Sequence, residues 1–121
     1  MLCNLLDAHF APVAPLAQRV DALLENQFHR DVSLDEIAAL VGVDKFALCH
    51  RYHDAQGVSV MEQLQRIRIA KAKQYLGATA HPIAYIGELC GFHDASYFTK
   101  VFHRATGLTP SAWRLYQSKK G

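Results

Sequence analysis

Short polar and basic side chains gather on one side of the segment 94–106. Its apolar residues Phe98, Val101 and Phe102 recur at helix spacing and should face a core. The other side then presents Ala95, Ser96, Thr99, Lys100 and His103. Small residues let a helix approach the edges of base pairs, and hydroxyl and ammonium groups donate hydrogen bonds to acceptors on guanine or thymine. This pattern predicts that the segment reads bases in the major groove of DNA.

A second segment, 44–56, has the same organisation but different chemistry. Leu48, Tyr52 and Ala55 are expected to face the core, which leaves an outward set of Lys45, Phe46, Cys49, His50 and His53. A cysteine thiol is a weak hydrogen-bond donor, and a neutral imidazole offers one donor and one acceptor. We therefore expect this segment to add less to base preference than the segment 94–106.

The two segments belong to a unit that the chain repeats. The apolar and glycine pattern of residues 34–43 recurs in residues 83–92, at an offset of 49. The pattern of residues 48–57 recurs in residues 98–107 at an offset of 50, so the second copy carries one extra residue just after its turn. A short amphipathic helix, a turn with glycine and a second helix describe a helix-turn-helix unit.

Helix starts are marked by residues that cap free backbone amides. Ser33 and Ser59 are each followed, three residues later, by a glutamate, which is the spacing of a capping box. Thr109 precedes Pro110, and a cap residue followed by proline is a further helix start. No stretch shows the alternation typical of a strand.

The expected fold is all-α, with two helix-turn-helix subdomains joined by a long connecting helix and about seven helices in all. A helix over residues 60–76 would be roughly 25 Å long. It could place each unit in a successive major groove, about 34 Å apart along one face of the duplex. We expect a tail or linker remnant, the first subdomain, the connecting helix and the second subdomain at residues 1–15, 16–58, 59–76 and 77–121.

Basic residues are concentrated after residue 43. Residues 1–43 hold two arginines against six acidic residues, whereas residues 44–121 hold eleven Lys and Arg against five Asp and Glu. This bias suits a polyanion such as nucleic acid, with a solvated basic surface as the alternative interpretation. On the side of the connecting helix opposite its apolar residues lie Arg66 and Lys73. The residues expected to contact the DNA backbone are Lys45, Arg66, Lys73 and Arg104.

The stretch 91–114, GFHDASYFTKVFHRATGLTPSAWR, resembles the signature of the AraC/XylS transcription regulators. Residues 33–57 and 66–72 are similar to the earlier part of that family's DNA-binding domain, and the resemblance covers residues 16–116. It implies a seven-helix domain that binds a double-stranded DNA operator through two recognition helices and regulates transcription in the bacterial cytoplasm, at the nucleoid. The base-reading positions that it implies are Phe46, Cys49, His50, Ala95, Ser96, Thr99 and Lys100.

One departure from the family concerns the first recognition helix. Cys49 and His50 stand where many relatives show Gln and Arg, which implies a weaker or different base preference at that half of the operator. Many members also carry a separate sensor domain, so the chain is expected to be either a stand-alone regulator or an excised C-terminal domain. The domain itself is expected to be monomeric, with dimerisation only through a sensor domain and RNA polymerase as a further candidate partner.

Other kinds of site have less support. Cys49, His50 and His53 lie close together on one helix, but a zinc site needs three or four converging ligands and the sequence offers no second cluster. We expect no metal, no cofactor and no enzyme activity, because nucleophile elbows, phosphate-binding glycine loops and paired catalytic carboxylates are missing. A helical protein-interaction module without DNA binding is the alternative function.

Several single residues are expected to have structural roles. Cys90 should be a small buried thiol, with redox sensing as a lesser alternative, and Trp113 and Tyr116 should belong to the core. Arg68, close to the apolar side of the connecting helix, should extend its charge to solvent or pair with a carboxylate. Three cysteines without CxxC spacing argue against a disulfide framework and suit a reducing compartment. No signal peptide or membrane span is expected.

Overall fold

The computed structural model describes residues 14–120, which form seven helices and contain no strand. The all-α fold class with about seven helices is therefore confirmed. The tail expected at residues 1–15 lies almost wholly outside the described part of the chain. In chain order the helices are α2 (Leu16–Gln27), α3 (Leu34–Val41), α4 (Lys45–Gln56), α5 (Val60–Ala78), α6 (Ile83–Leu89), α7 (Ala95–Thr106) and α8 (Pro110–Lys120).

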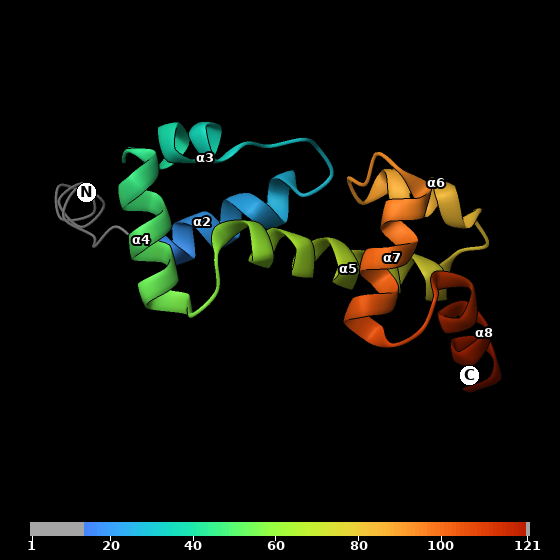
Figure 1. Cartoon of the computed structure of the whole chain (residues 1–121). Helices are drawn as coiled ribbons and strands as arrows, with labels where there is room; N and C mark the ends of the chain where they lie inside the picture. Colours follow the sequence, from blue (N-terminus) through green and yellow to red (C-terminus); the bar gives the residue numbers. More distant parts are fainter. Residues whose placement is uncertain (1–13, 121) are drawn as a thin grey trace, which may run out of the picture.

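Helix α5 forms the long axis of the molecule. Figure 1 shows α2, α3 and α4 around the beginning of α5, and α6, α7 and α8 around its end. The helix starts at Val60 and continues to Ala78, two residues beyond the expected end. It stops at Thr79, whose backbone is extended and whose hydroxyl donates a hydrogen bond to the carbonyl of Tyr75, at 2.8 Å. No helix in residues 14–120 is both long enough and apolar enough to cross a membrane.

Each end of α5 is packed into its own hydrophobic core. Leu64 and Ile67 belong to the first core, together with buried residues of α2, α3 and α4. Ile69 and Leu76 belong to the second core, together with buried residues of α6 and α7. Burying one large apolar side chain stabilises a fold by about 1.5–3 kcal/mol, so each core holds its helix-turn-helix unit against the same connecting helix.

The expected capping box is complete at one of the two sites. Ser59 accepts a hydrogen bond from the amide of Glu62, and the Glu62 carboxylate accepts one from the amide of Ser59, both at 3.0 Å. Ser33 likewise accepts from the amide of Glu36, at 3.1 Å. The Glu36 carboxylate, however, pairs with Arg30 instead of returning to the cap. The prediction for Ser33 was therefore half right, because the preceding loop brings a cation to Glu36.

Three residues, 42–44, separate α3 from α4, and five, 90–94, separate α6 from α7. One of the two additional residues is the insertion that the change of offset predicts, and the other arises because α6 ends one residue earlier than α3 in the aligned repeat. In the first unit Gly42 and Val43 separate α3 from the cap residue Asp44. In the second unit an additional residue, His93, precedes the cap residue Asp94. The carboxylate of Asp44 accepts from the amide of Ala47, and that of Asp94 from the amide of Ser96, both at 2.8 Å. Both recognition helices therefore begin at an aspartate cap.

Two residues expected in the core are exposed. Ala55 is exposed in the last turn of α4, and so is the next residue, Gln56, whose amide donates to Asp21 of α2 at 2.7 Å. The Tyr116 residue is 52 % exposed, because the terminal helix α8 turns Trp113 towards the core instead. The Trp113 ring packs edge-on against Phe102, with 5.9 Å between the ring centroids, as the core assignment of Trp113 predicts.

Cys90 is fully buried beneath the turn of the second unit, as expected for a small apolar residue. Burial raises the pKa of its thiol from an ordinary value of 9.0 to about 12, and the nearby Arg68 and Lys71 offset part of this rise. Between these two values the folded protein keeps a proton that the unfolded chain releases.

The free energy of unfolding should therefore fall as the pH rises above about 9, by up to about 1.4 kcal/mol per pH unit from this group alone. The Cys90→Ala variant has no thiol at this position, so this part of the alkaline decrease in the free energy of unfolding should be absent from it. Urea unfolding of both proteins near neutral pH and above the ordinary thiol pKa measures the difference. An equal alkaline loss in the two proteins would assign it to other groups.

Candidate nucleic-acid interface

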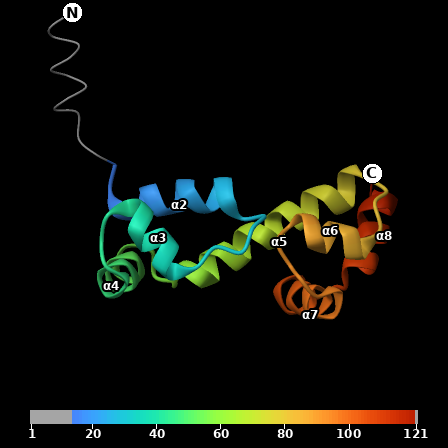
Figure 2. The same ribbon diagram turned by 90° about the horizontal axis from the view of Figure 1, so that it is seen from above.

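Helices α4 and α7 occupy equivalent positions at the two ends of α5. Figure 1 shows them running in the same direction, separated by the length of the connecting helix. In Figure 2 both are seen almost end-on and both lie on the same side of α5. Two helices that are nearly parallel and project from one side form a bipartite surface.

Helix α7 presents the polar face that its sequence predicts. Ala95, Ser96 and Lys100 are exposed, and Thr99 is half-buried beside them. Underneath, Phe98, Val101 and Phe102 are buried in the second core. The outward residues of α7 can donate through an ammonium group and two hydroxyl groups, and Ala95 adds no bulk at the beginning of the helix.

Helix α4 presents a more aromatic face, and two of its basic groups lie beside acidic residues. Phe46 is 81 % exposed and its ring is parallel to that of His50, with 6.1 Å between the centroids. The Nε2 atom of His50 lies 3.6 Å from a carboxylate oxygen of Asp54, one turn later. Cys49 is half-buried, and Lys45 pairs with Asp35 at 3.5 Å. Two of the polar groups of α4 therefore already have acidic partners within the first unit.

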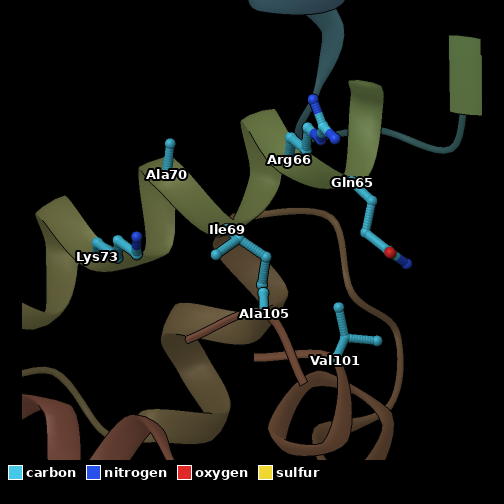
Figure 3. Close-up of a pocket in the computed structure, with 7 residues that line it drawn as sticks. All are labelled: Gln65, Arg66, Ile69, Ala70, Lys73, Val101 and Ala105. Carbon is cyan, nitrogen blue, oxygen red and sulfur yellow. The ribbon is translucent and has the colours of Figure 1, made fainter. Parts of the chain in front are cut away.

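Two of the four cations of α5, Arg66 and Lys73, line a groove against α7. Arg66 is exposed as expected, but Lys73 is half-buried, with its Nζ atom 5.1 Å from the centroid of the Trp113 ring. Arg66 and Lys73 were expected on the side of α5 opposite its apolar residues, but Lys73 is partly covered because α8 packs beside this part of α5. Figure 3 shows both cations at a groove of about 370 Å³ whose lining residues are Gln65, Arg66, Ile69, Ala70, Lys73, Val101 and Ala105.

Two hydrogen-bonded contacts made by α5 were not predicted from the sequence. Gln65 on α5 donates to the hydroxyl of Tyr97 on α7, at 3.3 Å. Arg68 does not pair with a carboxylate, since it donates to the backbone carbonyls of Phe28 and Arg30. No local sequence motif predicts the hydrogen bonds of Arg68, because their acceptors are backbone atoms about forty residues away. Among residues 14–120, no three His, Cys, Asp or Glu side chains converge as metal ligands would.

The sequence and structure were compared with those of known proteins. The sequence profile of a family described as a helix-turn-helix domain matches residues 37–115. A transcriptional regulator from Chromobacterium violaceum, described as having an AraC-type DNA-binding domain, has a similar structure, with a TM-score of 0.82. It is 26 % identical, and the match covers 88 % of this chain and 96 % of that one. The chain belongs to the AraC-type helix-turn-helix family.

Other AraC-type proteins and structures extend the comparison. The HTH-type transcriptional activator RhaR of Escherichia coli K12 is 33 % identical over 105 residues, which are 87 % of this chain. The match spans 36 % of the length of that relative. The C-terminal domain of AraT, a response regulator from Geobacillus stearothermophilus, has a TM-score of 0.81 at 27 % identity, with 88 % of each chain covered. The resemblance to the AraC family is thus confirmed.

Proposed function

We propose that the chain binds double-stranded DNA sequence-specifically and regulates transcription, with α4 and α7 in successive major grooves. One observation carries the proposal: two equivalent helices with exposed polar faces project from the same side of the connecting helix. The major groove admits an α-helix, and its base edges carry a distinct pattern of donors and acceptors for each base pair. The relatives support this role, since RhaR is described as a transcriptional activator.

In this proposal the two helices divide the contacts unequally. Base edges would be contacted by Ser96, Thr99 and Lys100 on α7 and by Phe46 and His50 on α4, with Ala95 and Cys49 against the groove wall. Phosphates would be contacted by the exposed Lys45, Arg66 and Arg104 and, from the groove beside Trp113, by Lys73. Because α4 offers fewer free donors, α7 would carry most of the sequence preference.

The proposal has further parts that concern partners. One copy of the domain would suffice for binding, because it already contains both reading helices. RNA polymerase is the partner through which an activator at the bacterial nucleoid would act. A footprint on one face of the duplex, covering two major-groove segments at a one-to-one stoichiometry, is the expected result. A strict need for two copies would contradict the monomeric part alone.

Selection of bound sequences from a random duplex pool tests the function directly. The selected sequences should share two short conserved segments, hereafter the half-sites, about one helical turn apart. Affinity should fall steeply with salt: the logarithm of the binding constant should decrease linearly with the logarithm of the salt concentration, with a slope of about −0.9 per phosphate contact. Arg66→Ala should weaken binding to all duplexes alike and make this slope shallower by about 1. If no duplex is retained, the helical protein-interaction module becomes the better description.

A further inference from the structure

The two helix-turn-helix units meet at the middle of α5. Figures 1 and 2 both show the loop after α2 reaching along the connecting helix to the turn that precedes α7. This contact joins the end of α2 in the first unit to the turn of the second unit. It borders both hydrophobic cores, because Phe28 packs against the first and Gly91 lies between Cys90 and Phe92 of the second, but it is separate from the faces of α4 and α7 that are proposed to read DNA.

Arg68 is the centre of this contact. Its Nε atom donates to the carbonyl of Phe28 at 2.9 Å, and a terminal guanidinium nitrogen donates to the carbonyl of Arg30 at 3.0 Å. Phe28 directly follows the last residue of α2, where backbone carbonyls lack helical partners and a cation is favourable. The planar guanidinium donates to the two carbonyls from two nitrogen atoms held in a fixed geometry, whereas an ammonium group would have to reach both from a single atom.

Gly91 brings the second unit onto the same atoms. Its φ angle is +94°, and a Cβ atom at this position would lie 2.5 Å from the Phe28 carbonyl oxygen and 2.8 Å from Nε of Arg68. A side chain here would have to displace backbone as well as the guanidinium. The turn before α7 therefore rests against the end of α2, with Arg68 between them and no space for a larger residue.

Weaker contacts surround this centre. Lys71 pairs with Glu25 at 3.3 Å and lies 5.4 Å from the centroid of the Phe28 ring. His93, the extra residue of the second turn, has its Nε2 atom 3.9 Å from a carboxylate oxygen of Asp31. Exposed pairs of this kind stabilise by about 0–1 kcal/mol each, so Arg68 and Gly91 carry most of the coupling.

We propose that Phe28, Arg30, Arg68 and Gly91 form an interunit clasp that sets the spacing between α4 and α7 and makes the domain selective for the spacing of its two half-sites. This inference rests on the proposed function. When two binding modules are held rigidly, the second binds only where its site coincides with the geometry of the first. Arg68 is a positioning residue in this scheme and need not touch DNA.

The clasp can be tested first without DNA. Spin labels on cysteines at His53 and His103, with Cys3 and Cys49 replaced by serine, report the distance between α4 and α7. Arg68→Met should broaden the distribution of this distance, because the turn before α7 loses its link to α2. Arg66→Met, the same substitution two residues earlier on the exposed side of α5, should leave the distribution narrow. Equal widths in both variants would overturn the clasp.

A second experiment measures affinity for the duplex obtained by selection from the random pool and for the same duplex with two base pairs inserted between the half-sites. Each base pair turns the duplex by about 35°, so this insertion rotates one half-site by about 70°. The parent protein should lose about tenfold or more in affinity on insertion, and Arg68→Met about threefold or less, because a looser pair of units can engage both sites. Arg66→Met should bind all duplexes more weakly but keep the tenfold discrimination.

Three outcomes contradict the inference: a parent insensitive to the insertion, unchanged discrimination in Arg68→Met, or unchanged distances. A parent that binds no duplex would contradict the proposed function, and the distance measurement would still decide whether the clasp exists. If Arg68→Met does not fold by circular dichroism, Arg68→Lys replaces it. That variant keeps the charge but has one donor nitrogen where Arg68 has two bonded ones, so its distance distribution and its discrimination should lie between those of the parent and an unclasped protein.

Discussion

Phe98→Ala is expected to lower the free energy of unfolding by about 3–5 kcal/mol, the usual range for a buried phenylalanine. The Phe98 side chain is fully buried, with ring centroids 5.0 Å from Phe92 and 5.9 Å from Phe102. On its other side lies Gly87, where an added Cβ would come within 2.7 Å of the ring. Glycine has no side chain that could move into the space, so the cavity should persist. Urea unfolding followed by circular dichroism measures the loss.

Tyr97→Ala provides the matched control for this substitution. Tyr97 is the neighbouring aromatic residue on the same helix, but it is 50 % exposed, and its hydroxyl accepts a hydrogen bond from Gln65 at the surface. Its replacement should cost about 1 kcal/mol or less, as for surface sites. Similar losses for Tyr97→Ala and Phe98→Ala would mean that the second core does not hold α7 in place.

The largest functional effect is expected from Lys100→Ala. Lys100 is exposed on the outward face of α7, next to the half-buried Thr99, and its ammonium group can donate to the O6 and N7 acceptors of guanine. A good base contact provides about 1–3 kcal/mol of discrimination, so its loss should flatten the preference at one or two base pairs. Selection of bound duplexes with the parent and the variant measures this change.

Two variants separate base reading from other contributions. Cys49→Ala changes a residue at an equivalent face of α4 whose weak thiol donor is half-buried, so the selected sequence should hardly change. Arg104→Ala removes a charge on α7 expected to contact phosphate and should reduce affinity without altering the selected sequence. The assignment is wrong if Cys49→Ala erases the preference while Lys100→Ala leaves the recognised sequence intact.

Local signals explain why most of the fold follows from the sequence. The aspartate caps at Asp44 and Asp94 and the capping box at Ser59 depend on residues within one helical turn, so their spacing is visible in the chain. The faces of α7 follow from the period of Phe98 and Phe102, because a helix with an apolar stripe has one way to bury it.

Contacts between distant segments explain what the sequence did not predict. Ala55 has the period of a core residue, but the end of α4 contacts α2 through a polar, exposed hydrogen bond from Gln56 to Asp21. Lys73 has the period of a solvent-facing residue, yet α8 places Trp113 beneath it. The partners of Arg68 are backbone carbonyls, which every residue carries, so no residue type marks them.

The separation of the two cores along α5 has a consequence for how such a protein can diverge. Among the described residues, no buried side chain belongs to both cores, so substitutions that reshape the outward face of α4 leave the packing beneath α7 unchanged. The two halves of a target sequence are then free to drift independently during evolution. The distance between them is not, because Gly91 meets Phe28 through backbone atoms. Proteins that descend from this domain should therefore keep the spacing between the two half-sites while they come to recognise different base sequences.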